Sequence, residues 1–160
     1  MWDILAPFAA WLGATPFALW VGGSTDRIAW LFTAHLFGMV FLLGGTICLC
    51  LRMLSLVLRQ TPVQAVARAV LPFSTIGLAI MIASGFIIFS GGAVAYFAGP
   101  LFRLKMVLLA IAIAFQFSVF RKVATADEGR FSPGMRGGVA IAGLLIWFSV
   151  ACAGRAIAFF

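Results

Sequence analysis

His35 is the residue of this sequence with the widest choice of chemistry, and it is the only histidine among 160 residues. It lies within an apolar stretch that begins near Ile28 and is long enough to span a membrane. Ionisable side chains at such depth are costly and usually face the interior of a helix bundle. An imidazole there can bind haem iron or another metal ion, or form a hydrogen bond with a quinone carbonyl. The alternative is that it only donates a hydrogen bond between two helices.

Two methionines are candidates for a second, weaker ligand. Met39 follows His35 by four residues and so shares its helix face, and Met81 lies in the next apolar stretch. Thioether sulfurs bind soft metals and haem iron. Alternatively, both methionines only fill apolar space. The sequence therefore predicts a cofactor site on His35, with Met39 or Met81 as a weak sixth ligand of an iron.

Three cations could hold the acidic edge of such a cofactor. Arg103 and Lys105 open the third apolar stretch, and Arg155 lies near the end of the fourth. Residues two apart on a helix are rotated by about 200°, so we expect only one of Arg103 and Lys105 to face the bundle. The alternative is plain anchoring to lipid headgroups. A neutral imidazole beside two or three cations predicts an anionic, partly apolar ligand.

The elements that must position these residues are transmembrane helices. The chain is 64% hydrophobic and 9% charged, with a mean hydropathy of +1.18, whereas soluble domains carry about 25% charged residues. About 20 apolar residues suffice to cross a bilayer as a helix. We predict an all-α fold in one integral membrane domain, residues 1–160: a four-helix transmembrane bundle with an N-terminal interfacial helix. The interfacial helix is expected at about 2–22, and the spanning helices at about 28–58, 71–97, 101–120 and 139–159.

Small residues on the first two spanning helices predict that these helices pack face to face. Gly38 and Gly45 lie beside the face that carries His35, and Gly77, Ser84 and Gly85 share one face of the second helix. Small side chains let two helix backbones approach closely in a membrane. We therefore expect this face of the second helix to lie against the first.

Several functional classes are disfavoured. The apolar stretches contain no paired carboxylates, no nucleophile with a neighbouring base and no phosphate-binding loop, which argues against an independent catalytic activity. Ion transport is disfavoured because no acidic residue lies inside a predicted span. The 11 lysines and arginines are scattered between apolar blocks, so nucleic acid is not an expected partner. Cys48, Cys50 and Cys152 predict no disulfide framework.

Four segments resemble, in order and spacing, an uncharacterised bacterial family of small four-helix membrane proteins: TAHLFGMVFLLGGTICLCLRML, the glycine and phenylalanine of SGFIIFS, GPLFRLKMVLLA and IWFSVACAGRAIAFF. That family is known as a domain of unknown function and looks distantly similar to copper-resistance D and cytochrome b561-like membrane proteins. The resemblance implies a four-helix fold and no particular activity. It marks as matching positions His35, Arg52, Gly85, Phe102, Arg103, Lys105, Gly154 and Arg155. Cys50 and Arg121 stand where family members often have an acidic residue and a histidine, so we expect no haem or metal site at the inner end.

Two functional hypotheses remain open. The first is a membrane electron-transport subunit that binds a b-type haem, or alternatively a quinone, in the outer half of the bundle near His35. The second is a non-catalytic anchor or accessory subunit of a larger membrane protein complex, because 17 phenylalanines offer apolar surface to lipid and to other subunits. A two-haem cytochrome with four histidine ligands is excluded by the single histidine.

Basic residues predict the orientation of the chain in a bacterial inner membrane. Seven of them lie in or near the connections after the first and third spans: Arg52, Arg59, Arg68, Arg121, Lys122, Arg130 and Arg136. Loops rich in lysine and arginine stay in the cytoplasm. We therefore predict cytoplasmic loops at about 59–71 and 121–137 and both termini in the periplasm.

A single cysteine tests this orientation. Gly129→Cys, in a chain whose three native cysteines are replaced by serine, should not react with a membrane-impermeant maleimide in intact cells, because the loop is expected in the cytoplasm. It should react after the membrane is permeabilised. Labelling of intact cells at the same rate as of opened cells would place this loop outside.

Overall fold

The computed structural model describes the backbone of residues 2–127 and 129–157 and the side chains of residues 4–127 and 129–157. Every regular element within these ranges is a helix. The predicted all-α fold is confirmed. Four helices are long and apolar enough to cross a membrane, which indicates a multi-pass membrane protein.

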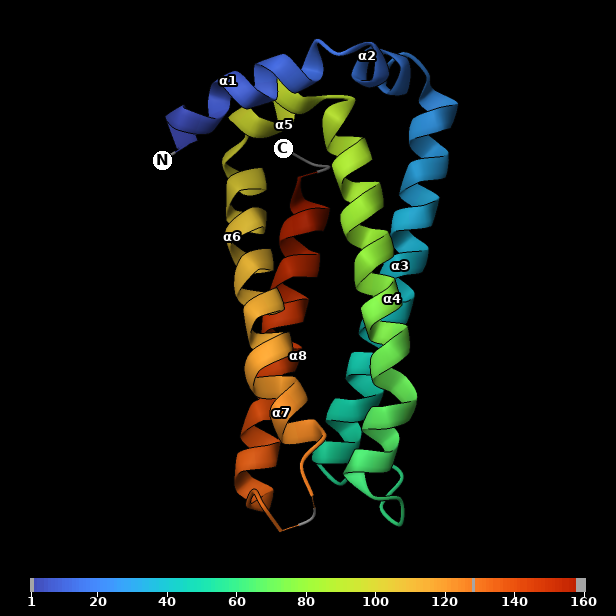
Figure 1. The fold of residues 1–160 in the computed structure, drawn as a ribbon, viewed down its shortest axis with the longest axis vertical. Helices are drawn as coiled ribbons and strands as arrows, with labels where there is room; N and C mark the ends of the chain where they lie inside the picture. Colours follow the sequence, from blue (N-terminus) through green and yellow to red (C-terminus); the bar gives the residue numbers. More distant parts are fainter. Residues whose placement is uncertain (1, 128, 158–160) are drawn as a thin grey trace.

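The four long helices form two antiparallel pairs that stand side by side (Figure 1). The first pair is α3 (Thr25–Met53) with α4 (Val63–Ser90). The second is α6 (Pro100–Phe115), continued by a π-helical turn η1 (Gln116–Phe120) and by α7 (Arg121–Ala124), with α8 (Pro133–Ala156). Contacts between α3 and α8 join the two pairs. Only 22% to 33% of each apolar window is buried inside the bundle, so most of its apolar surface is left to face lipid.

Three short helices lie across the end of the bundle where α3 begins and α4 ends (Figure 1). They are α1 (Trp2–Gly13), α2 (Pro16–Gly22) and α5 (Ala93–Ala98), and we call this the capped end. The predicted interfacial helix is therefore two helices, bent by 72° between them. The hydroxyl of Thr15 accepts a hydrogen bond from the amide of Ala18 at 3.2 Å, and Pro16 follows it at the first helical position, so these residues begin a new helix.

The ends of the spanning helices differ from those expected from hydropathy. The first ends at Met53 rather than near residue 58, because Ser55 and Leu58 have positive φ angles of 58° and 50° that leave the helix. The second begins at Val63 and ends at Ser90, so that residues 93–98 form α5. The fourth begins at residue 133, where the hydroxyl of Ser132 accepts a hydrogen bond from an amide of the first turn. Hydropathy averages over a window and does not detect such caps.

At the opposite end, which we call the loop end, side chains bind the connecting backbone. The guanidinium of Arg52 donates to the carbonyl of Thr61 at 2.6 Å, and that of Arg136 donates to the carbonyl of Asp127 at 3.0 Å. The amide of Gln64 donates to the carbonyl of Thr125 at 3.0 Å, which ties the start of α4 to the loop before α8. The two arginines thus fix the loop of their own helix pair, and the Gln64 bond joins one pair to the other.

The closest packing in the bundle is between α3 and α4. Each helix contributes four residues spaced by three, four and three positions, which meet in antiparallel pairs: His35 with Ser84, Gly38 with Met81, Leu42 with Gly77, and Gly45 with Ser74. A Cβ atom added to Gly77 would lie 2.5 Å from the backbone nitrogen of Leu42, and one added to Gly38 would lie 2.9 Å from Cγ of Met81. Most of these pairs have a glycine on one side, which lets the backbones approach. The expectation that Gly77 and Ser84 face the first helix is confirmed.

The close packing of α3 against α4 predicts which glycines the stability of the bundle requires. Gly77→Ala should destabilise the detergent-solubilised bundle by about 1–3 kcal/mol, because its new methyl group would overlap the backbone of α3. Gly44→Ala is the matched control on α3, since a Cβ there meets no heavy atom within 4 Å. Thermal unfolding followed by circular dichroism measures both. Equal melting temperatures for Gly77→Ala and Gly44→Ala would contradict the packing described.

Candidate functional site

His35 lies on α3 about three turns from the capped end and is half-buried. Its Nδ1 atom is 2.9 Å from the hydroxyl oxygen of Ser84 on α4. The imidazole therefore bridges the two helices of the first pair. A hydrogen bond between helices was the alternative to a cofactor site, and Nδ1 makes such a bond. The other ring nitrogen, Nε2, is not part of it.

The hydroxyl of Ser84 decides the direction of that bond. Its oxygen is 2.6 Å from the carbonyl oxygen of Ile80, one helical turn earlier, and a carbonyl can only accept. A serine has one hydroxyl proton, which this bond uses, so the Ser84 oxygen accepts a hydrogen bond from the N–H group at Nδ1 of His35. A neutral imidazole protonated on Nδ1 keeps a lone pair on Nε2. His35 can thus offer Nε2 to a hydrogen-bond donor or to a metal ion.

Gly85 provides the space in which the imidazole lies. A Cβ atom at this position would be 3.1 Å from Cε1 of His35 and 3.6 Å from Nδ1. Any side chain there would press on the ring or turn it away from Ser84. The sequence predicts that Gly85 faces the first helix, and it does. It makes room there for the side chain of His35 rather than for the backbone of that helix.

Lys105 lies against the last helix of the bundle. A Cβ atom on Gly154 of α8 would be 3.3 Å from its Nζ atom. Of Arg103 and Lys105, it is therefore Lys105 that faces into the bundle.

Arg103 and Arg155 lie on the same two helices as Lys105 and Gly154. The Nε atom of Arg103 donates to the carbonyl oxygen of Phe97 on α5 at 3.1 Å. The guanidinium lies 5.5 Å from the centre of the Phe97 phenyl ring. Arg103 thus points toward α5 at the capped end. Arg155 is exposed in the last turn of α8. Their role as partners of a cofactor stays a prediction.

The methionines differ in their surroundings. Met81 faces Gly38 and packs against a buried cluster that includes Leu42 and Trp147. Met39 is half-buried on α3. Among the described residues, no three His, Cys, Asp or Glu side chains come together as metal ligands. A metal site would therefore depend on His35 with sulfur or non-protein ligands.

A buried polar pair beside the π-helical turn was not expected from the sequence. Trp147 on α8 donates through its indole nitrogen to the side-chain oxygen of Gln116 at 3.1 Å, and both residues are at most 5% exposed. Phe120 follows in the same turn and is fully buried against Gly143 of α8, where a Cβ would lie 3.1 Å from its ring. The available signal was a glutamine inside an apolar stretch. Single π turns within α-helices are frequent at functional sites.

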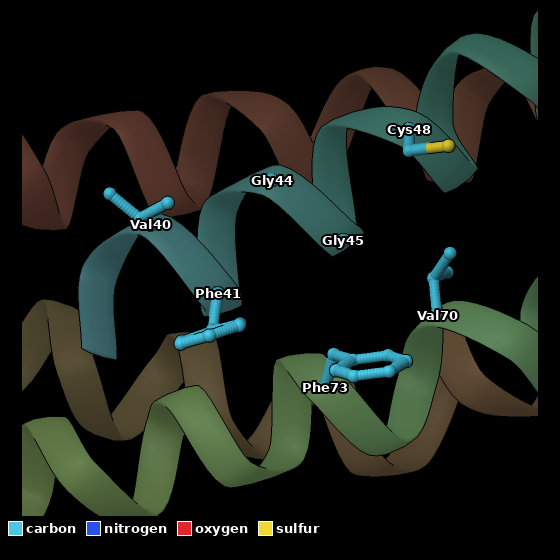
Figure 2. Close-up of a pocket in the computed structure, with 7 residues that line it drawn as sticks. All are labelled: Val40, Phe41, Gly44, Gly45, Cys48, Val70 and Phe73. Atoms are coloured by element: carbon cyan, nitrogen blue, oxygen red, sulfur yellow. The ribbon is translucent and has the colours of Figure 1, made fainter. Parts of the chain in front are cut away.

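Two cavities lie on the surface of the bundle. The larger, of about 310 Å³, is an outward-facing groove lined by Phe41, Gly44, Gly45 and Cys48 of α3 and by Val70 and Phe73 of α4 (Figure 2). The other, of about 230 Å³, lies between α1, α5 and α6 at the capped end. Neither includes His35.

The assignment of the His35 proton can be tested without ambiguity, because the chain has one histidine. In the protein labelled with ¹⁵N-histidine, nuclear magnetic resonance should show Nδ1 protonated and Nε2 unprotonated, since Ser84 accepts from Nδ1. Ser84→Ala should remove this preference, whereas Ser149→Ala should not, because Ser149 is exposed and bonds only its own helix. A wild-type spectrum with the proton on Nε2 would reverse the direction of the bond.

Comparisons with other proteins identify the chain by family and not by activity. No curated protein and no solved structure is significantly similar to it. The expected distant similarity to copper-resistance D and cytochrome b561-like proteins is not supported by these comparisons. Residues 8–160 match the sequence profile of a family of unknown function (DUF6644), and the chain therefore belongs to that family.

Proposed function

We propose that this protein is a membrane redox subunit that binds a quinone between its two helix pairs, with Nε2 of His35 as the main contact. The observation that carries the proposal is the pair of hydrogen bonds at Ser84, which leaves a lone pair on Nε2 inside a membrane-spanning helix. Ionisable residues at such depth in a membrane-spanning helix usually serve a function. Quinone is the cofactor class whose chemistry best fits these residues.

A quinone fits because the site pairs an acceptor with a donor. Nε2 of His35 would accept a hydrogen bond from one hydroxyl of a reduced quinone, and the ammonium of Lys105 would donate one to the oxygen of the other hydroxyl. The rest of a quinone is an apolar ring with a lipid-soluble tail, and the surrounding helices are apolar and mostly open to lipid. The ligand could therefore reach His35 from the bilayer.

Haem b is the second cofactor that Nε2 could bind, since an imidazole held through Nδ1 is also a good ligand of iron. Two observations favour quinone. Met81, a candidate sixth ligand, packs in the buried cluster with Leu42 and Trp147, and Arg103, a candidate partner for the propionates, points to α5. Ligand sites are usually about 300–1,000 Å³ in volume. The head group of a quinone is a single flat ring system and needs less of such a volume than a haem.

In this proposal the chain holds and orients the quinone and acts with another protein of the membrane that exchanges the electrons. His35 would accept the hydroxyl proton of the reduced form at Nε2, and Ser84 would hold the ring in the orientation that this requires. Lys105 would stabilise negative charge on the opposite oxygen. This proposal shares one feature with the accessory-subunit hypothesis, because the protein that exchanges the electrons would be a second subunit.

The test is the cofactor content of protein purified in a mild detergent. Solvent extraction followed by liquid chromatography should find quinone in wild type, and His35→Ala should reduce it by roughly tenfold, the cost of one strong buried hydrogen bond. Lys105→Gln should reduce it less. Lys122→Gln is the matched control, because Lys122 is exposed on α7 at the loop end.

Other outcomes would contradict the proposal. A reduced-minus-oxidised spectrum with a Soret band that disappears in His35→Ala would make the cofactor haem. Equal quinone content in wild type and His35→Ala would remove His35 from the site. No cofactor in wild type, together with a larger complex that survives extraction, would favour the non-catalytic accessory subunit.

A further inference from the structure

The larger cavity is a groove on the outward side of α3 and α4, and its shape is long and narrow. Its volume is about 310 Å³, and along α3 it runs from Val40 to Cys48, a length of about 12 Å at the helical rise (Figure 2). Phe41 of α3 and Phe73 of α4 line its sides and are 44% and 55% exposed. The residues that line it are uncharged. The groove therefore suits a single apolar chain that lies along the helix.

Two glycines of α3 keep this groove open. Gly44 is exposed, and a Cβ atom there would meet no heavy atom within 4 Å. Gly45 follows it and also lines the groove. A larger side chain at Gly44 would therefore begin in open space and extend into the groove.

A cation follows the groove toward the loop end. Gly44, Cys48 and Arg52 are spaced four residues apart and so follow one side of α3, with Arg52 about 6 Å beyond Cys48. The Arg52 guanidinium donates to the carbonyl oxygens of Thr61 and Arg59, at 2.6 Å and 3.3 Å. Within the described part of the chain, these bonds use two of its five N–H groups. The remaining N–H groups can bind an anion.

Arg59 adds a second cation to the same loop. It is exposed between α3 and α4, and its Nε atom donates to the carbonyl oxygen of Ser55 at 2.7 Å. Arg52 binds the backbone carbonyl of Arg59, so both arginines belong to the connection that closes this end of the helix pair. The planar fork of a guanidinium matches a phosphate group. An apolar groove inside the membrane thus leads to two arginines at the membrane surface.

We propose that this groove binds a glycerophospholipid of the leaflet at the loop end, with one acyl chain between Val40 and Cys48 and the phosphate on Arg52 and Arg59. The uncharged lining matches the chain, and the arginines match the phosphate. An α-helix of a partner is about 10–12 Å wide and could insert only single side chains into this groove. The site does not include His35 and does not depend on the proposed quinone.

Delipidated protein in detergent, titrated with dioleoyl phosphatidylglycerol and analysed by native mass spectrometry, tests the proposal. We expect one tightly bound lipid per chain in wild type. Gly44→Leu and Arg59→Gln should each weaken binding by roughly tenfold, the first because its side chain fills the groove and the second because charge-assisted hydrogen bonds are lost. Arg59→Lys should weaken binding less, since it keeps the charge. Arg59 is the better arginine to change, because Arg52 also holds the loop.

Matched controls separate this site from general adhesion of lipid. Gly138→Leu makes the same change on α8, where an added Cβ also meets no heavy atom within 4 Å. Arg121→Gln removes an exposed arginine of the other helix pair at the loop end. Both variants should bind the lipid like wild type. Dioleoylglycerol, which has the same acyl chains and no phosphate, should bind much more weakly.

Three outcomes would overturn the proposal. Equal binding by Gly44→Leu and Gly138→Leu would remove the acyl chain from the groove. Equal binding by Arg59→Gln and Arg121→Gln, or equal retention of dioleoylglycerol, would remove the phosphate from the arginines. Dimers of lipid-free wild type that Gly44→Leu abolishes would assign the groove to a second copy of this chain instead.

Discussion

The contact between the backbones of α3 and α4 is the constraint on which the rest of this bundle depends. At Gly38 and Gly77 the two helices are so close that a single added carbon would overlap the opposite chain. This contact sets the register, and the register places His35 opposite Ser84, two helical turns from Gly77. The hydrogen bond of the imidazole is therefore a consequence of packing that uses almost no side-chain atoms. In lipid, where burial of apolar surface gives little driving force, such close contact is what makes two helices associate.

The two ends of the bundle are stabilised by different interactions. At the loop end, arginine and glutamine side chains bind backbone carbonyls, as Arg136 does with Asp127. At the capped end, a buried cluster of Ala9, Leu12, Ala93 and Phe97 joins α1 to α5 through small and apolar side chains. The candidate cofactor site lies closer to the capped end, since His35 is about three turns from the start of α3.

Much of the fold could be predicted from the sequence, because hydropathy and small-residue spacing are local properties. The four spans and the face of Gly77 and Ser84 are of this kind. The helix ends were less accessible, since Ser132 and Thr15 act through single caps that no average over residues detects. The sequence could not predict which of Arg103 and Lys105 faces the bundle. Helical periodicity shows that the two side chains point in different directions, and only the neighbouring helices show which one turns inward. Gln116 was overlooked because its partner, Trp147, is 31 residues away.

The π-helical turn at Gln116–Phe120 has a consequence for how this span could have arisen and how it can vary. A π turn holds one more residue than the α-helical turn it replaces, so it marks an insertion in an otherwise regular helix. Because the wide turn absorbs the extra residue, removing one residue there restores regular hydrogen bonds and leaves the faces of the flanking helices in place. A deletion in the regular part of α6 would instead rotate everything after it by about 100°. Phe120 and Val123, both buried at the loop end, would then turn away from the core. Deletions inside and outside this turn therefore have unequal effects.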